Sequence, residues 1–124
     1  NTPPTFAIYV AGLVFDWLES KGGLSQMEVV NRRKASKLYK LIDQSDFYKN
    51  PIDVQSRSLM NVPFKLVDPQ LDSAFLEESK KVGLLNLKGH RSVGGMRASL
   101  YNAVDESSVD ALCSFMQDFE RIYG

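Results

Sequence analysis

A stretch near the start of the chain, Thr5 to Ser20, carries apolar side chains around most of a helical circumference. Pro3-Pro4 suits an extended entry and a first helical turn, and Gly22-Gly23 marks the end of the helix. A helix that is apolar on most sides has to be buried on most sides. We therefore expect one side of it to face another domain or a second subunit. Its apolar residues are Phe6, Ile8, Tyr9, Val10, Leu13, Val14, Phe15, Trp17 and Leu18.

The size and charge of the chain limit the classes of protein it can belong to. Its 124 residues allow one domain with a single core, and its 15 basic residues balance its 15 acidic ones. This balance gives no overall field that would attract nucleic acid or an anionic membrane, so any anion has to be recognised locally. We expect no nucleic-acid or membrane partner, and we predict that the run Arg32-Arg33-Lys34 is a solvated helix face. No apolar stretch is long enough to cross a bilayer, and the start lacks the features of a signal peptide.

The single cysteine, Cys113, cannot form an internal disulfide. Its position beside Ala111, Leu112 and Phe115 in a helical pattern predicts a small buried hydrophobe, and a reducing cytoplasm fits this usage best. One histidine and one cysteine cannot make a dedicated zinc site, so we expect no metal.

The rest of the chain mixes helical and extended patterns without a strict alternation. This predicts an α+β fold of two layers, with a short, mostly antiparallel sheet packed against helices. Pro63 within the main strand candidate indicates an edge or a bulge there. In chain order the expected elements are a helix over about 24–45, an extended piece at Phe47-Tyr48, a strand from Arg57 to Val67, a helix from Pro69 to about Val82 capped by Asp68, strands at Leu84–Leu87 and Gly95–Tyr101, and a helix over 105–123. The residues expected to face inward from the last helix are Val109, Leu112, Cys113, Phe115, Met116, Phe119 and Ile122.

The segment Gly89 to Ser99 has the composition of a loop that holds an acidic ligand. It contains three glycines, His90, Arg91 and Arg97 between two apolar runs. Arginine matches carboxylate or phosphate oxygens two at a time, histidine can add a further hydrogen bond, and glycines let backbone amides approach an anion. On residue types alone, a pair of surface arginines beside a glycine turn explains the segment about equally well. The spacing does not match the phosphate-loop or dinucleotide-binding patterns.

The run from Leu84 to Ala103 resembles the C-terminal signature of the phosphoserine aminotransferase family. Asn1-Thr2-Pro3-Pro4-Thr5 is similar to the segment that opens the last third of that enzyme, and Met60–Phe64 and Ser114–Met116 follow in the family's order. This resemblance implies the small C-terminal domain of a fold type I aminotransferase that depends on pyridoxal 5′-phosphate. The reaction it implies interconverts 3-phosphohydroxypyruvate and glutamate with O-phosphoserine and 2-oxoglutarate in serine biosynthesis, with a related step of pyridoxine biosynthesis in many bacteria.

The resemblance also implies roles for five residues of this sequence. His90 and Arg91 would contact the phosphate of the substrate, and Arg97 would bind its α-carboxylate. Asn1 and Thr2 would contact the phosphate of pyridoxal phosphate in the neighbouring subunit, which implies a homodimer with shared active sites. Glutamate carries a carboxylate at each end, so one anion pocket can serve both half-reactions.

The motifs that hold the cofactor in this family are absent from the sequence. Family members place the Schiff-base lysine, the aspartate partner of the pyridine nitrogen and a stacking aromatic ring in a larger preceding domain. The resemblance therefore implies that residues 1–24 lead from that domain, that residues 25–124 form the small domain, and that the chain has no catalytic residue of its own. We expect an excised or separately expressed domain that is inactive alone.

Two alternatives come from other classes. An aminotransferase of the same fold but different specificity would have no need of the His90-Arg91 pair. A non-catalytic anion-binding or interaction module could exist naturally as a short chain. Sequence upstream of Asn1 separates these, because a cofactor-lysine domain there supports the enzyme and an immediate start methionine supports the module.

Overall fold

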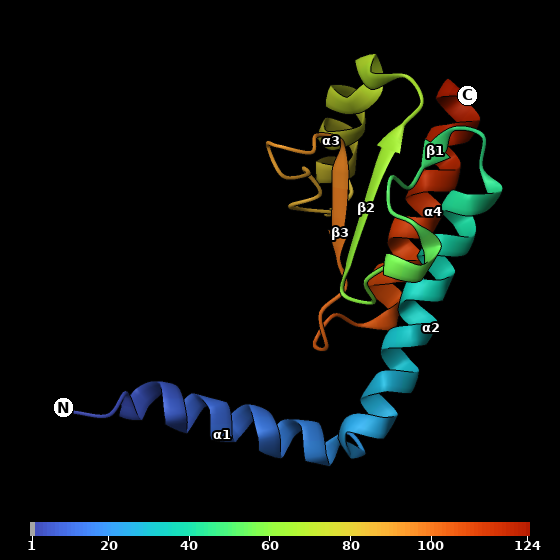
Figure 1. The fold of residues 1–124 in the computed structure, drawn as a ribbon. Coiled ribbons are helices and arrows are strands. Elements are labelled where there is room, and N and C mark those ends of the chain that lie inside the picture. Colours follow the sequence, from blue (N-terminus) through green and yellow to red (C-terminus); the bar gives the residue numbers. More distant parts are fainter. Residues whose placement is uncertain (1) are drawn as a thin grey trace. The chain divides into compact units, whose positions relative to one another are not determined.

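The computed structural model describes residues 2–124, and the chain divides into two compact units, residues 1–30 and 31–124. Figure 1 labels the elements along the chain. Within the described residues, no helix has both the length and the apolarity needed to span a bilayer.

The first unit contains helix α1 (Thr5–Ser20), with the bounds that the sequence predicts. The helix ends because Lys21 N–H donates to Trp17 O and the next residue, Gly22, has a φ of 94°. No residue of α1 is buried, and the Phe6 side chain is 78% exposed. The expectation that one side of this helix faces another domain or a second subunit stays a prediction. Helix α2 (Gly23–Gln44) begins in this unit and continues into the second.

The second unit has a three-stranded antiparallel sheet in the order β1-β2-β3. The strands are β1 (Tyr48–Lys49), β2 (Asn61–Leu66) and β3 (Met96–Ser99). Tyr48 pairs with Leu66, and Arg97 pairs with Pro63. The α+β class and the antiparallel sheet are therefore confirmed, although β2 is shorter than predicted. It starts at Asn61 because the Ser58 hydroxyl accepts from the backbone N–H groups of residues 60 and 61 and makes a turn there.

Two short 3₁₀ helices and two further α-helices complete the unit. They are η1 (Val54–Ser56), η2 (Pro69–Leu71), α3 (Asp72–Lys81) and α4 (Glu106–Tyr123). The predicted cap is confirmed, since Asp68 Oδ1 accepts from Gln70 N at 2.9 Å. The predicted single helix after it is wrong in one respect, because its first turn is 3₁₀ and only the remainder is α-helical.

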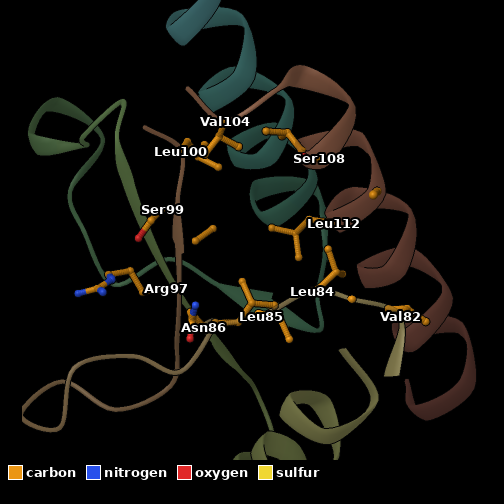
Figure 2. Close-up of a pocket in the computed structure, with 15 residues that line it drawn as sticks. Val82, Leu84, Leu85, Asn86, Arg97, Ser99, Leu100, Val104, Ser108 and Leu112 are labelled. Carbon is orange, nitrogen blue, oxygen red and sulfur yellow. The ribbon is translucent and has the colours of Figure 1, made fainter. Parts of the chain in front are cut away.

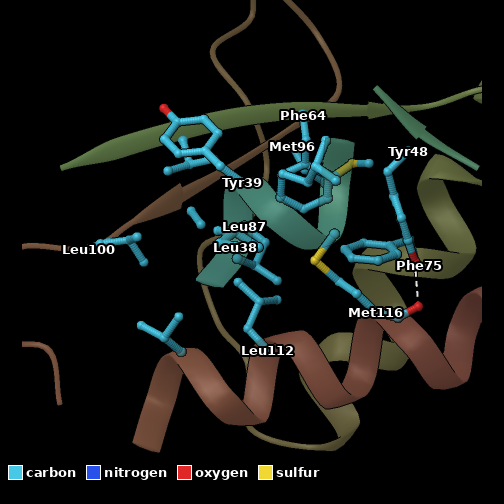
Figure 3. Close-up of a cluster of buried hydrophobic side chains, with 14 of the residues drawn as sticks. Leu38, Tyr39, Tyr48, Phe64, Phe75, Leu87, Met96, Leu100, Leu112 and Met116 are labelled. Atoms are coloured by element: carbon cyan, nitrogen blue, oxygen red, sulfur yellow. Dashed lines mark hydrogen bonds between the residues drawn. The ribbon is translucent and has the colours of Figure 1, made fainter. Parts of the chain in front are cut away.

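The core lies between one face of the sheet and the helices (Figure 3). Along β2 and β3 buried side chains alternate with less buried ones, so Phe64 and Met96 point into the core and Arg97 lies on the opposite face. Phe75 from α3 meets Phe64 edge to face at 5.7 Å between ring centroids. Tyr48 is also fully buried, and its hydroxyl donates to Met116 O at 2.8 Å, while burial raises its pKa.

Three local predictions are wrong. Leu84–Leu87 is not a strand, because Asn86 has a φ of 60° and turns the backbone out of the extended conformation; only Lys88 forms a bridge, with Met96. Ile122 does not face inward and is 64% exposed. Cys113 is only partly buried, although burial still raises the pKa of its thiol.

The prediction that Arg32-Arg33-Lys34 forms a solvated face fails at Lys34. That side chain is fully buried, and its ammonium group donates to three backbone carbonyls. Arg33 is half exposed and forms an ion pair with Glu106 at the start of α4. The helix periodicity places Lys34 on the same face as Leu38, which explains why one residue of the basic run turns inward.

Candidate functional site

The loop between Lys88 and Met96 is closed by backbone hydrogen bonds. Gly89 N–H donates to Gly95 O at 2.8 Å, and the N–H groups of Val93 and Gly94 both donate to His90 O at 2.9 Å. These bonds place the two ends of the loop side by side, so its tip is residues 90–94. The segment was predicted to be a loop between two strands, and only the strand after it, β3, forms.

Two of the loop glycines are required by close contacts. A Cβ on Gly89 would lie 2.8 Å from Gly95 O and even closer to Gly94 O. Gly95 has a φ of 60°, and a Cβ there would lie 2.7 Å from Phe64 O in β2. The glycines thus allow the loop to cross itself and to rest on the sheet.

The two side chains that the sequence assigns to a phosphate lie at the exposed tip. His90 Nδ1 shares a hydrogen bond with Ser92 Oγ at 2.7 Å, and both His90 and Arg91 are exposed. No hydrogen bond or ion pair joins the Arg91 side chain to any other residue in the range 2–124. The charge of Arg91 is therefore open to an anion from solution or from another chain segment.

Arg97 lies in a different setting, in the middle of β3. Its backbone N–H donates to Leu87 O at 2.7 Å, and its side chain is partly buried. The Nε atom is buried without a hydrogen-bond partner among the described residues. A buried guanidinium N–H without an acceptor carries a desolvation cost that a bound carboxylate would remove. The Arg97 side chain is thus suited to bind an anion.

Arg97 lines a cavity of about 500 Å³ between the 82–87 segment, β3 and α4. Its polar lining includes Asn86, Ser99 and Ser108, and its apolar lining includes Leu112. Figure 2 shows the Arg97 side chain extending away from Leu112, on the same side of β3 as Ser99. The guanidinium therefore extends from the lining of the cavity away from its α4 wall, on the less buried face of β3.

The structure does not bring the predicted anion-binding residues into one cavity. Of His90, Arg91 and Arg97, only Arg97 belongs to the lining of the Arg97 cavity, and no lysine belongs to it. Thr2 is exposed near the start of the first unit, and Asn1 lies outside the described residues. The roles given to these five residues stay predictions.

Sequence reasoning missed two residues beside Arg97. Asn86 adopts a left-handed conformation that asparagine tolerates better than most residues, so an asparagine just before Leu87-Lys88-Gly89 was an available signal. Ser99 follows Arg97 by two positions, hence on the same face of the strand, and its hydroxyl donates to Asn61 Oδ1 at 3.3 Å. Strand alternation alone predicts that Ser99 accompanies Arg97.

A family model described as aminotransferase class-V matches residues 1–112 of the chain. The chain is 66% identical over 119 residues to a phosphoserine aminotransferase of Hahella chejuensis, which covers 96% of this chain and 33% of that protein. It is 57% identical to the phosphoserine aminotransferase of Marinomonas sp., over 100% of this chain and 34% of that protein. The chain thus spans about a third of the length of these curated relatives.

Solved structures of phosphoserine aminotransferases are also similar to this chain. Phosphoserine aminotransferase from Bacillus circulans subsp. alkalophilus superposes with a TM-score of 0.95 and 50% identity, over 100% of this chain and 35% of that one. A pyridoxal-phosphate-bound phosphoserine aminotransferase from Trichomonas vaginalis superposes with a TM-score of 0.87 and 46% identity, over 94% of this chain and 34% of that one. Because the family model matches most of its length, the chain belongs to the class-V aminotransferase family.

Proposed function

We propose that the chain is the C-terminal domain of a phosphoserine aminotransferase and supplies its recognition of substrate anions. The complete protein would interconvert 3-phosphohydroxypyruvate and glutamate with O-phosphoserine and 2-oxoglutarate in serine biosynthesis. The observation that carries this proposal is Arg97, a partly buried arginine with an unpaired Nε at a cavity, in a chain whose whole length is similar to enzymes of that name.

Arg97 is proposed to bind the α-carboxylate of both substrates. A transaminase binds an amino acid and a keto acid in turn, and each carries a carboxylate beside the reacting carbon. A bidentate arginine pair fixes the orientation of that carboxylate and therefore the position of the reacting carbon. The surrounding β-ladder keeps the Arg97 backbone in place for this task.

His90 and Arg91 are proposed to bind the phosphate of the substrate, or the side-chain carboxylate of glutamate. Support comes from their exposure and from the absence of any ion pair at Arg91 within the described residues. Because the Arg97 cavity does not include them, one complete site needs surfaces from outside this chain. A homodimer with shared active sites meets this requirement and is part of the proposal.

Pyridoxal phosphate is proposed as the cofactor of the complete protein, but the residues around the Arg97 cavity do not fit it by themselves. No lysine lines that cavity to carry the cofactor as an imine. The attachment group would therefore come from the remaining part of the longer protein. Thr2 has an exposed side chain and could donate to the cofactor phosphate together with Asn1. A cytoplasmic location and a second role in pyridoxine biosynthesis also belong to the proposal.

The test compares three variants of the complete protein in a transamination assay. Arg97→Met should raise the KM for glutamate and for phosphoserine alike, because both substrates lose the same partner. Arg91→Met should weaken the binding of phosphoserine by about 2–3 kcal/mol. The binding of an unphosphorylated serine analogue should be weakened much less. Arg121→Met is the matched control, since Arg121 is an exposed residue of α4 that pairs with Asp118 among the described residues.

Two results would contradict the proposal. Unchanged turnover of glutamate by Arg97→Met would show that Arg97 does not bind the substrate carboxylate. Equal losses for the phosphorylated and unphosphorylated substrates in Arg91→Met would favour an aminotransferase of the same fold with other specificity.

A further inference from the structure

Lys34 is a buried cation to which the proposed function assigns no role. It lies on α2 within the second unit and is 0% exposed. Its Nζ donates to Tyr101 O and Val104 O at 2.9 Å each and to Leu100 O at 3.3 Å. All three hydrogens of the ammonium group are therefore directed at backbone carbonyls.

These carbonyls belong to the segment that connects β3 to α4. Leu100 follows the last residue of β3, and its own N–H donates to Met60 O at 2.6 Å. Val104 N–H donates to Tyr101 O at 2.9 Å and closes a turn. Lys34 thus binds the carboxyl end of the strand that carries Arg97 and both ends of the turn after it.

The neighbouring turn of α2 strengthens the same attachment. Asn31 is 5% exposed, and its Nδ2 donates at 2.8 Å to Oδ1 of Asn102, which lies within the turn whose two end carbonyls Lys34 binds. Two successive inward positions of α2 therefore hold the 100–104 segment.

The charge of Lys34 has no carboxylate at ion-pair distance within residues 2–124. Burial lowers the pKa of its ammonium group, and the nearby carboxylates of Asp105 and Glu106 partly oppose that shift. A buried charge is costly unless hydrogen bonds compensate it, so the three carbonyls are what make the charged form tolerable. Conversely, an apolar residue at this position would remove one donor from each of the three carbonyls, of which Tyr101 O would keep the N–H of Val104.

We propose that Lys34 is a positioning residue for substrate binding: by fixing residues 100, 101 and 104 it holds β3 so that Arg97 meets the substrate carboxylate in the required orientation. The inference rests on the proposed role of Arg97. Arg97 lies three positions before Leu100 and is held on its other side by the bond to Leu87 O. With the end of β3 released, the strand can shift or twist, and a small displacement of a positioning group weakens binding strongly.

Lys37 provides a matched control on the same helix. It lies one turn after Lys34 and has the same charge, but its Nζ pairs with the side chains of Glu106 and Asp110 at 2.8 and 2.6 Å. It has no bond to the 100–104 backbone among the described residues. Lys37→Met therefore removes a lysine from α2 without releasing the end of β3.

The experiment measures transamination by the complete protein with bound cofactor, with glutamate and with phosphoserine, for Lys34→Met, Lys37→Met and Arg97→Met. We expect Lys34→Met to raise the KM of both substrates by about tenfold with a smaller change in kcat. Lys37→Met should change KM by less than about twofold. A purely structural role of Lys34 would lower the amount of active enzyme, hence the apparent kcat, and leave KM unchanged.

Hydrogen exchange provides a second measurement that does not depend on activity. In Lys34→Met, the amides of Leu100 and Arg97 should exchange faster, whereas the amide of Val67, which donates to Phe47 O in another part of the sheet, should not. If Lys34→Met does not fold, Lys34→Gln, which keeps two donors on a shorter chain, replaces it in both measurements.

The outcomes separate this inference from the proposed function. An unchanged KM in Lys34→Met, while Arg97→Met raises it, overturns the positioning role alone. Unchanged KM values in both variants overturn the role of Arg97, and the positioning role with it. Unchanged exchange at Leu100 and Arg97 shows that Lys34 does not hold the strand, whatever the KM values are.

Discussion

Arg97 lies opposite Pro63 in the β2–β3 ladder, at a pair whose backbone groups point away from each other. Arg97 N–H donates to Leu87 O instead, and Pro63 O accepts from Asn50 Nδ2 at 2.7 Å. The missing N–H of proline therefore removes no bond from the ladder. The sequence indicated an edge or a bulge at Pro63; β2 is in fact the middle strand, but β1 pairs only with residues 65 and 66, so no strand lies beside Pro63 on that side.

Replacing Pro63 should therefore have only a small effect on stability. We expect Pro63→Ala to lower the free energy of unfolding by about 0.4–1 kcal/mol, because the unfolded chain becomes more flexible while the ladder is unchanged. Asn50→Ala should cost a comparable amount, about 0.5–1.5 kcal/mol, through the lost donor to Pro63 O. Urea unfolding of the chain measures both. A loss of several kcal/mol in Pro63→Ala would show that proline is required by the strand itself.

Gly95 should tolerate a side chain less well than its neighbour Gly94. Both have positive φ values, 60° and 72°, but a Cβ on Gly95 would collide with Phe64 O, whereas one on Gly94 meets nothing within 4 Å. Gly94→Ala should cost about 1 kcal/mol of unfolding free energy, and Gly95→Ala about 2–3 kcal/mol. Equal costs in thermal unfolding would mean that the loop does not rest on β2 as described.

The ion pairs of Glu106 predict a loss of stability in acid. Arg33 Nε donates to both of its carboxylate oxygens, and Lys37 adds a further contact, so that the two cations hold the pKa of Glu106 at about 2. A depressed carboxyl pKa stabilises the folded state at pH values above the unfolded-state pKa, and this contribution disappears as the pH falls from about 4.5 to about 2. Arg57 lowers the pKa of Asp43 in the same direction, so it adds to the effect.

Urea midpoints measured between neutral pH and pH 2 check this prediction. The wild-type midpoint should fall across the acid range, and Glu106→Gln should start lower and fall less, so the two curves converge near the acid end. Parallel curves would show that Glu106 has the same pKa in the folded and unfolded chain. High salt should reduce the difference at neutral pH, since the pair is partly exposed.

Phe75 should be among the most costly core residues to truncate. Its ring is fully buried and meets the rings of Tyr48, Phe64, Phe115 and Phe119 at centroid distances of 5.1–6.2 Å. We expect Phe75→Ala to lower the free energy of unfolding by about 3–5 kcal/mol. Phe6→Ala, at an exposed position of α1, should change it by less than about 0.5 kcal/mol. A large effect at Phe6 would show that α1 is covered in the isolated chain.

The sequence by itself determined most of the helices and the family. The bounds of α1 follow from Pro3-Pro4 and Gly22-Gly23, and the periodicity of α4 predicted the burial of Val109, Leu112, Met116 and Phe119. The glycines and arginines of the 89–99 segment carried the resemblance that the class-V match confirms. These signals are local, because caps, glycine conformations and helical periodicity depend on residues a few positions apart.

Only the tertiary structure decided the positions of the charged groups. Lys34 belongs to a basic run that looks solvated, yet it is buried because its acceptors, 66 to 70 positions away, cross the inner face of α2. The 84–87 segment is as apolar as a strand, but Asn86 turns it so that Leu87 O is available to Arg97. The separation of the exposed His90-Arg91 tip from the Arg97 cavity likewise depends on how the loop folds back on itself. Such contacts join segments far apart in the chain, and neither composition nor periodicity within one segment specifies which of them meet.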